Sequence, residues 1–463
     1  MLVQQARNNF GPGGLKHHRL LLLSRKHAQH NLCIGATPFH ASSWEGAAMD
    51  AIYERCCGLD IHKRTVVACM IVPGSGRQAR KEVRTFGTMT DDLLTLADWL
   101  AAESVTHVAM ESTGVFWKPL FNLLEDRFQL LLVNARDIKQ VPGRKTDVKD
   151  CEWIADLLRH GLLKASFVPD RQQRELRELV RYRTTLVRER SAEVNRLQKT
   201  LEGANIKLAS VASDPLGLSG REMLNALIDG STDVASMAEL ARGKMRAKRG
   251  LLERALAGRM AAHQRFLLTE QLCHIDALDE GIARASGEIA ERMRPFAEAL
   301  ERLDTIPGIG QRMAEILVAE IGTDMRRFPS AAHLASWAGM CPGNQESAGK
   351  RKSGRTRKGN VWLRAALIES AHSLGRGRGT YLAAQYRRLT ARRGKKKAAV
   401  ALGHSILVIV YHLLSRGDVY HDLGVQYFDE GRRERLEHGL VRRLQDLGYK
   451  VTLEPTQPTT SAA

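Results

Sequence analysis

The spacing of apolar residues changes along the chain and predicts a different architecture for each part. Between residues 55 and 135, short apolar runs alternate with stretches in which apolar residues recur at helical spacing. Such short runs predict strands, and the 3.6-residue period predicts helices. We expect strands over residues 56–62, 65–73, 81–88, 106–111 and 128–135, and helices over 91–103 and 116–126. Three strands followed by alternating helices and strands are typical of a mixed α/β sheet domain.

Residues 171–204 predict one long, uninterrupted helix. Apolar residues recur there every seven positions, at Val180, Val187, Val194 and Leu201, and leucines flank them. Most other positions of the segment carry Arg, Glu or Lys. A heptad pattern of this kind predicts either a coiled coil or a long helical hairpin.

The remaining segments complete a predicted five-part organisation. Residues 220–300 are mostly helical with a weaker period, and a new segment opens at residue 303. The first fifty residues show neither period and predict a disordered extension or a misassigned start, with Met49 as the true initiator. We therefore expect an extension (1–50), a sheet domain (51–165), a helical coiled-coil region (166–300), a mainly helical C-terminal domain (301–420) and a charged tail (421–463).

Composition and charge point to a polyanionic partner. The 463 residues are 43% hydrophobic and 26% charged, as in ordinary globular proteins. A formal charge of +19 favours nucleic acid over an acidic membrane surface. The most apolar run, residues 401–414, is too short for a membrane span and contains two histidines. Seven cysteines without CxxC spacing argue against a disulfide framework or a zinc site and favour the cytoplasm.

Four carboxylates of the sheet domain form a candidate metal site. Asp60 and Glu111 each end an apolar strand, whereas Asp147 and Asp150 lie three residues apart on one helix face. A buried carboxylate without a partner is costly, and several that converge can hold a hard cation such as Mg²⁺. Bound Mg²⁺ polarises a phosphodiester and stabilises its leaving oxygen.

Each of these acids also has an ordinary structural explanation, such as a turn cap, a first-turn helix acid or an arginine partner. Together, in this order of strands and helices, they predict a ribonuclease-H-like domain. Cations that would suit a nucleic-acid backbone lie beside them, at Lys63, Arg144, Lys145 and Lys149.

Two segments of the C-terminal domain predict phosphate contacts. In IPGIG, Gly308 and Gly310 join two predicted helices and would let backbone N–H groups approach a phosphate. A plain tight connection explains this pentapeptide equally well. Residues 346–360 hold six basic residues in fifteen, at Lys350, Arg351, Lys352, Arg355, Arg357 and Lys358. Their spacing to Gly343 and Gly349 does not match a P-loop, so we interpret the segment as a nucleic-acid-binding loop with mobile glycines.

The same segment offers three hydroxyl groups, on Ser347, Ser353 and Thr356. No neighbouring histidine stands out as a base for Ser347. A hydroxyl that attacked a phosphodiester here could be activated by cations or by metal-bound carboxylates from another part of the chain. The residues alone leave open which hydroxyl, if any, reacts.

Taken together, GLDIHK, MESTG, GRKTDVKD, IPGIG, LASWAGMCPGNQESAGKRKSGRTRKGN and WLRAAL resemble, in content and order, the Asp-Glu-Asp-Asp (RuvC-like) insertion-sequence transposases. The resemblance covers residues 55–415, and these enzymes are serine-using DNA recombinases guided by a bridge RNA. It implies that Asp60, Glu111, Asp147 and Asp150 form a resolvase-like Mg²⁺ site. It further implies that Ser347 is the nucleophile that forms a phosphoserine link to DNA.

The resemblance also implies the partners of the chain. They are the DNA of the element ends and the target, a guide RNA, and further copies of the chain in a dimer or tetramer. The expected location is the bacterial cytoplasm, at the nucleoid. Two other functions remain open: a metal-dependent nuclease of the junction-resolvase kind, in which water attacks, and a non-catalytic nucleic-acid-binding scaffold.

Overall fold

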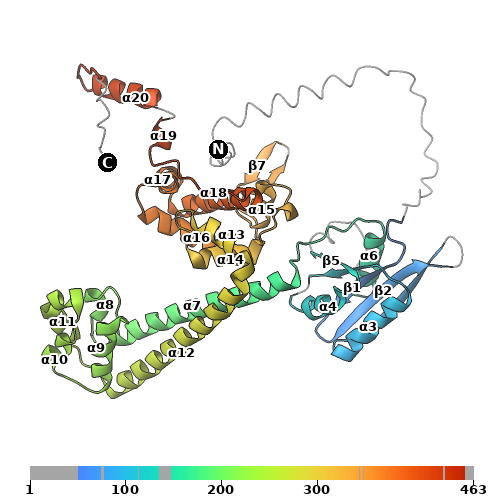
Figure 1. Cartoon of the computed structure of the whole chain (residues 1–463), viewed down its shortest axis with the longest axis horizontal. Coiled ribbons are helices and arrows are strands. Elements are labelled where there is room, and N and C mark those ends of the chain that lie inside the picture. Colours follow the sequence, from blue (N-terminus) through green and yellow to red (C-terminus); the bar gives the residue numbers. More distant parts are fainter. Residues whose placement is uncertain are drawn as a thin grey trace. The chain divides into compact units, whose positions relative to one another are not determined.

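The computed structural model describes two compact units, one ending at Arg171 and one beginning at Gln172 (Figure 1). The described residues are 51–74, 78–112, 114–134, 147–343, 345–347, 349–430 and 433–453. For residues 147–149, 345–347, 351–353, 429–430 and 433–436 the description covers the backbone only. The predicted extension 1–50 lies outside the described residues, as do Arg144 and Lys145.

The first unit contains a five-stranded sheet in the order β3-β2-β1-β4-β5. Its strands are β1 (Cys56–Ile61), β2 (Thr65–Pro73), β3 (Ala79–Gly87), β4 (His107–Glu111) and β5 (Gln129–Val133). The first three strands pair antiparallel, β4 runs parallel to β1, and β5 runs parallel to β4. The predicted mixed α/β sheet is confirmed, and the ends of its elements differ from the prediction by at most two residues.

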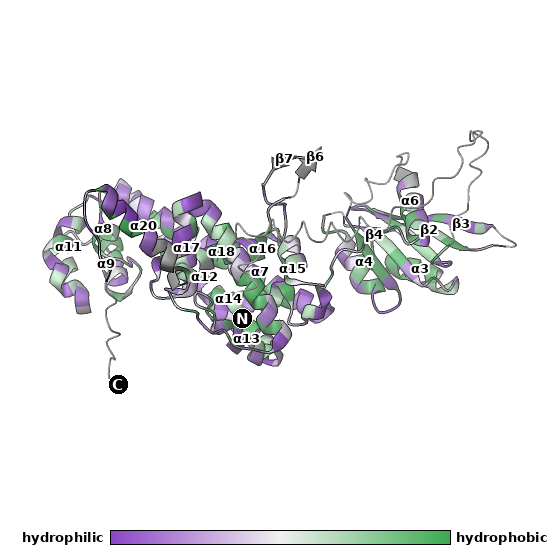
Figure 2. Cartoon of the chain, turned by 90° about the horizontal axis from the view of Figure 1, so that it is seen from above, coloured by the Kyte–Doolittle hydropathy of each residue, from purple (hydrophilic) through white to green (hydrophobic). Residues whose placement is uncertain are grey.

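Helices cover both faces of this sheet. The helices are α3 (Thr90–Ala102), α4 (Trp117–Leu124) and α6 (Asp147–Arg159). Cys57 belongs to the core beneath α3 and α4, whereas Cys56 packs with Ile154 of α6. Adjacent residues of a strand point to opposite faces, which explains why these two neighbouring cysteines lie in different cores. Figure 2 shows that β2, the strand beside β1, is predominantly apolar.

The second unit begins with two long antiparallel helices, α7 (Arg171–Gly203) and α12 (Ala262–Met293). Ion pairs join Glu175 to Arg292 at 2.9 Å and Arg190 to Asp279 at 2.5 Å. Partner numbers on α12 fall as those on α7 rise, so the two helices run in opposite directions (Figure 1). The long helix therefore forms a helical hairpin within one chain, which is one of the two predicted alternatives.

Packing along α7 departs from the predicted heptad seam. Val180 and Leu201 are fully buried, but Val187 and Val194 are only half-buried. A straight helix drifts by about 20° per heptad, so a seven-residue repeat does not stay on one face. A charged residue of α7, Glu193, is buried instead, and its Oε2 atom lies 3.5 Å from Nδ1 of His274 on α12.

Short helices cap the far end of this pair. They are α8 (Leu208–Val211), α9 (Leu218–Ile228), α10 (Val234–Glu239), the 3₁₀ helix η1 (Gly243–Lys248) and α11 (Arg249–Leu256). Their apolar residues pack with Leu197 and Leu201 of α7 and with Leu268 and Leu272 of α12. The cap thus shares one core with the ends of both long helices.

Proline at Val187 is expected to break α7. It would remove a backbone hydrogen bond and clash with the preceding turn, which costs about 3 kcal/mol or more. We expect Val187→Pro to lower the free energy of unfolding by that amount in denaturant titrations followed by circular dichroism, whereas Val187→Ala keeps the helix. We also predict a smaller assembly mass for the proline variant. An unchanged mass would mean that α7 packs only within its own chain.

The rest of the second unit is a helical domain with one small hairpin. Its elements are η2 (Arg294–Phe296), α13 (Ala297–Asp304), α14 (Gln311–Ile321), η3 (Met325–Arg327), α15 (Ala331–Trp337), β6 (Gln345–Ser347), β7 (Lys350–Ser353), α16 (Val361–Arg376), α17 (Tyr381–Arg393) and α18 (Lys395–Arg416). The largely helical C-terminal region is confirmed. The charged tail also contains helices, α19 (Tyr427–Glu430) and α20 (Arg433–Asp446), and Figure 2 shows that α17 and α20 are largely hydrophilic.

Helix α18 is the centre of this domain. It contacts α13, α15, α16 and α17. Its 22 residues make it longer than the apolar run that the sequence suggested, and by length and composition it could cross a membrane. However, 67% of its most apolar window is buried inside the domain, which is the position of a core helix.

Candidate functional site

Two of the predicted carboxylates end neighbouring strands of the sheet. Strands β1 and β4 are parallel and pair Leu59 with Met110, so the next residues, Asp60 and Glu111, stand side by side. Asp60 is 8% exposed and Glu111 is half-buried. The strand register thus brings two carboxylates to the same edge of the sheet.

Both carboxylates lie on the face that α6 covers. At Gly58 the helix approaches so closely that an added Cβ would lie 2.4 Å from the backbone nitrogen of Ala155, which only glycine avoids. Side chains alternate along a strand, so Asp60 faces the same side as Gly58. Ala109 packs in the core beneath α6, which places Glu111 on that side by the same argument. Asp60 and Glu111 therefore face the helix that begins at Asp147.

The charge of Asp60 acts on this helix. Burial raises the pKa of the Cys151 thiol to about 11, and the negative charges of Glu152 and Asp60 add to the rise. Cys151 directly follows the half-buried Asp150, so Asp150 lies in the turn of α6 that feels the charge of Asp60. The structure thus brings Asp60, Glu111 and Asp150 to one region of the first unit.

A further residue at this site was not predicted. His62 lies just beyond β1, with its Nε2 atom 3.2 Å from Oδ2 of Asp60. It is exposed, as a residue in the turn between β1 and β2 should be. Its position two residues after Asp60, in GLDIHK, is the sequence signal that could have indicated it.

The four acids supply the kind of ligand that Mg²⁺ requires. Carboxylate oxygens are hard donors, and a cation would offset their mutual repulsion. Among the side chains that the structure describes, no three acidic, histidine or cysteine groups lie close enough to hold a metal ion. The side chain of Asp147 is outside that set. Mg²⁺ binding by the four acids therefore stays a prediction.

The predicted cations around the acids are described only in part. Lys63 is exposed in the turn after β1, and its carbonyl oxygen accepts a hydrogen bond from the Thr88 hydroxyl at 3.2 Å. Lys149 lies in the first turn of α6, and its side chain is not described. Lys63 is thus an available positive charge at the same end of β1 as Asp60.

The basic segment is a folded hairpin instead of the mobile loop that we predicted. Strands β6 and β7 pair antiparallel, with Ser347 opposite Lys350. Gly349 has a φ of +73° at the turn between them, a conformation that favours glycine. Further on, Gly359 packs so closely that an added Cβ would lie 2.4 Å from the backbone nitrogen of Gly339. Two of its glycines therefore shape the segment and do not loosen it. Ser347 occupies the last position of β6.

Contacts at the base of the hairpin hold the third candidate hydroxyl in place. Arg364 of α16 donates from Nη1 to the carbonyl oxygen of Gly339 at 2.7 Å and to Oγ1 of Thr356 at 2.9 Å. The backbone N–H of Gly343 donates to the carbonyl oxygen of Arg355 at 2.9 Å. Thr356 thus serves the fold, which leaves Ser347 and Ser353 as the candidate nucleophiles. The side chains of both serines lie outside the description, as do those of Arg351 and Lys352, whereas Lys350, Arg355, Arg357 and Lys358 are exposed.

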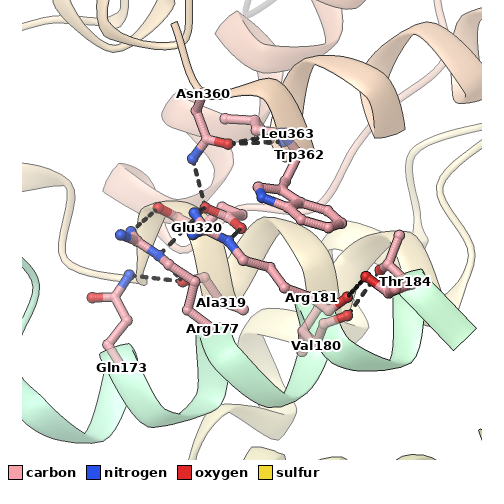
Figure 3. A network of polar contacts seen from close by, with 11 residues as sticks. Gln173, Arg177, Val180, Arg181, Thr184, Ala319, Glu320, Asn360, Trp362 and Leu363 are labelled. Atoms are coloured by element: carbon pink, nitrogen blue, oxygen red, sulfur yellow. Dashed lines mark hydrogen bonds and ion pairs between the residues drawn. The ribbon is translucent and has the colours of Figure 1, made fainter. Parts of the chain in front are cut away.

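A buried carboxylate fixes the end of the basic segment to the long helix (Figure 3). Glu320 of α14 is fully buried, and Arg181 of α7 donates to its two oxygens at 2.7 and 2.8 Å. The side-chain amide of Asn360 donates to the same carboxylate at 2.5 Å. Arg177 donates to the backbone carbonyl of Glu320 at 2.6 Å.

Asn360 also begins helix α16. Its Oδ1 atom accepts hydrogen bonds from the backbone N–H groups of Trp362 and Leu363, both at 3.1 Å, which is the N-cap contact that Asn favours. One residue thus stabilises the start of α16 and, through Glu320, binds it to α7. No pattern in the sequence predicted this network.

The predicted helix hairpin at IPGIG is present between α13 and α14. Gly308 has a φ of +80°, and an added Cβ would lie 2.6 Å from Cγ of Leu374, so the fold itself requires this glycine. Gly310 is the N-cap of α14, is exposed, and has open space around its Cα. A phosphate contact at Gly310 stays a prediction.

Comparison with known protein families finds two matches. Together they include the two candidate half-sites, which are the four acids of the first unit and the basic hairpin with Ser347 in the second. Residues 57–206 match a family model described as a transposase, of the Asp-Glu-Asp-Asp IS110 type. Residues 300–387 match a model described as a transposase of the IS116/IS110/IS902 family. The first range contains the four acids, and the second contains IPGIG and the basic hairpin.

Individual relatives carry similar descriptions. A probable family 20 transposase of Pseudomonas aeruginosa is 28% identical over 321 residues, 68% of this chain and 85% of the relative. The transposase for insertion sequence element IS1111A of Coxiella burnetii is 25% identical over 303 residues, 62% of this chain and 72% of the relative. A pilin gene-inverting protein of Moraxella bovis is 33% identical over 115 residues, which are 24% of this chain and 35% of the relative.

Proposed function

We propose that this chain, an insertion-sequence transposase of the IS110 type, cuts and rejoins DNA with a carboxylate-bound Mg²⁺ ion and a serine nucleophile. The observation that carries the proposal is the placement of Asp60 and Glu111 at neighbouring strand ends, both facing α6. The strand order and the positions of these acids also support a ribonuclease-H-like, RuvC-like assignment for the first unit.

In the proposed reaction, the Ser347 hydroxyl attacks a DNA phosphorus atom. A new bond forms between Ser347 Oγ and phosphorus, the bond to one deoxyribose oxygen breaks, and that oxygen leaves as a hydroxyl. The serine proton would pass to a carboxylate of the acidic site and from there to the leaving deoxyribose oxygen, so that the step neither gains nor loses a proton. A deoxyribose hydroxyl of another DNA end then attacks the phosphoserine, which restores Ser347 and joins the strands. Mg²⁺ would supply charge stabilisation for the leaving oxygen.

The basic hairpin would hold the reacting phosphate. Lys350 lies opposite Ser347 in the hairpin register, and Arg355, Arg357 and Lys358 are exposed just beyond β7. Lys and Arg neutralise phosphates without reading sequence. Lys63 would play the same part near Asp60.

Several further features of the proposal rest on the family resemblance. A guide RNA would select the DNA target, which the net charge of +19 allows but does not distinguish from DNA binding. Copies of the chain would assemble so that the serine of one half-site meets the acids of another, in a dimer or tetramer. We expect the enzyme to act on element ends and target DNA.

A covalent adduct tests this proposal. Protein, Mg²⁺, guide RNA and labelled element-end DNA would be incubated and resolved on denaturing gels. We expect an adduct that disappears in Ser347→Ala and persists in Ser353→Ala, the matched control one strand away. Cleavage without an adduct, unaffected by Ser347→Ala, would instead indicate a nuclease in which water attacks. Binding without cleavage would indicate a scaffold.

A further inference from the structure

We propose that a basic groove beside the serine hairpin binds the DNA strand on which the hairpin acts. The groove is a hollow of about 950 Å³ between the segment after β7 and the turn that joins α17 to α18. Its basic residues are Arg355, Arg364, Arg392, Arg393, Lys396 and Lys397. Four of them lie beyond residue 387, where the family match ends, and none of those four was predicted to bind nucleic acid.

Four of the six cations in the groove are not balanced by an acid from within the described part of the chain. Its lining contains no Asp or Glu. Arg392, Arg393, Lys396 and Lys397 are exposed and take part in none of the ion pairs between described residues. Exposed arginines in other parts of the second unit do form ion pairs, as Arg294 does with Glu291 at 2.6 Å. A concave cluster of cations without acids attracts a polyanion.

The local backbone adds to this imbalance. Lys396 and Lys397 lie in the first turn of α18, and Gly394, the N-cap, offers no side-chain acceptor. The N-terminal end of a helix carries a partial positive charge, so lysines there are unfavourable unless an anion is near. Arg392 and Arg393 close the last turn of α17, directly before Gly394. The two arginines, the two lysines and the N-terminal end of α18 all favour the same kind of ligand. That ligand is the phosphate groups of a nucleic-acid backbone.

The position of the groove favours DNA as its occupant. Gly354, Arg355 and Thr356 line it and directly follow β7, the partner of the strand that ends at Ser347. Arg364, which also lines the groove, holds Thr356 in place. A DNA strand bound in the groove would therefore run on to the serine hairpin. The choice of DNA over RNA rests on the proposed function, in which the hairpin acts on DNA.

Salt-dependent binding of duplex DNA tests the groove. In the full-length protein, Arg392, Arg393, Lys396 and Lys397 would all be replaced by glutamine. We expect DNA affinity to fall about tenfold or more at moderate salt, and the plot of log affinity against log salt to become shallower by about 0.9 for each lost phosphate contact. The matched control replaces two lysines and two arginines that are exposed in the second unit away from the groove: Lys199, Lys244, Arg246 and Arg254. We expect the control to keep the wild-type slope.

Further arms make the result decisive. Arg392→Lys with Arg393→Lys keeps the charge and should retain binding, and thermal denaturation checks that each variant is folded. An unchanged slope in the glutamine variant, an equal loss in the control, or a loss confined to duplex RNA would overturn the proposal. Ser347→Ala should bind DNA with the wild-type slope. The two proposals can also fail separately. If the wild-type protein formed no adduct but the glutamine variant still lost DNA binding, the groove would be supported and the serine chemistry refuted.

Discussion

Replacing Asp60 with asparagine is expected to abolish strand cleavage and to leave nucleic-acid binding intact. The substitution keeps the shape of the side chain but removes the charge that the proposed Mg²⁺ site requires. Loss of a single preorganised electrostatic contact in an active site costs about 10²–10³-fold in rate, and loss of the metal costs more. Cleavage of labelled element-end DNA, measured at saturating enzyme, gives the rate directly. DNA affinity, measured separately, should change little, because phosphates are bound by the basic residues.

Asp156→Asn is the control for this prediction. Asp156 lies on α6, the same helix as Asp150, but pairs with Lys81 at 2.6 Å at the surface. This variant loses one acid from the same helix and should cleave at close to the wild-type rate. If Asp60→Asn cleaved as fast as Asp156→Asn, Asp60 would not belong to the metal site. A fall in both variants would indicate that losing either acid disturbs the fold of the first unit, instead of removing a catalytic group.

Glu320→Ala is expected to lower the stability of the second unit strongly. It would leave Arg181 and Asn360 without the carboxylate that they contact, in a fully buried position. Breaking a buried charged pair by removing one partner costs about 3–5 kcal/mol. Denaturant titration followed by tryptophan fluorescence measures this cost, and Trp362, the second residue of α16, reports the local change.

The control is Glu298→Ala. Glu298 is 83% exposed and pairs with Arg302 at 3.0 Å along α13, so its removal should cost only about 0–1 kcal/mol. Equal effects of the two substitutions would show that the Glu320 network does not contribute specifically. Glu320→Gln keeps the shape and part of the hydrogen bonding, and its free energy of unfolding should lie between those of the wild type and Glu320→Ala.

The first unit could be predicted closely because its signals are local. Each strand is a short apolar run, and the carboxylates mark the ends of two of them. The parallel register of β1 and β4, which sets Asp60 beside Glu111, depends on contacts between residues about fifty positions apart. The sequence could suggest convergence but not supply this register. Each acid taken alone has an ordinary structural explanation. Only the four acids together predicted a metal site.

The second unit was predicted less well because its important contacts are distant in sequence. Glu320 meets Arg181 across 139 residues and Asn360 across 40. Neither pair has a periodic pattern that would reveal it. The groove likewise joins Arg355 to Lys396 through the packing of α16, α17 and α18. The hairpin of β6 and β7 was missed because Lys and Arg are not typical strand residues.

The antiparallel pair of α7 and α12 also acts as a spacer of fixed length. A helix of 33 residues is about 50 Å long, so the cap of α8 to α11 is held at that distance from the start of α7. Because the span depends on residue number, deleting seven residues from each helix would shorten it by about 10 Å and turn the cap by only about 20°. Evolution could therefore change the reach of this arm by whole heptads without redesigning either end.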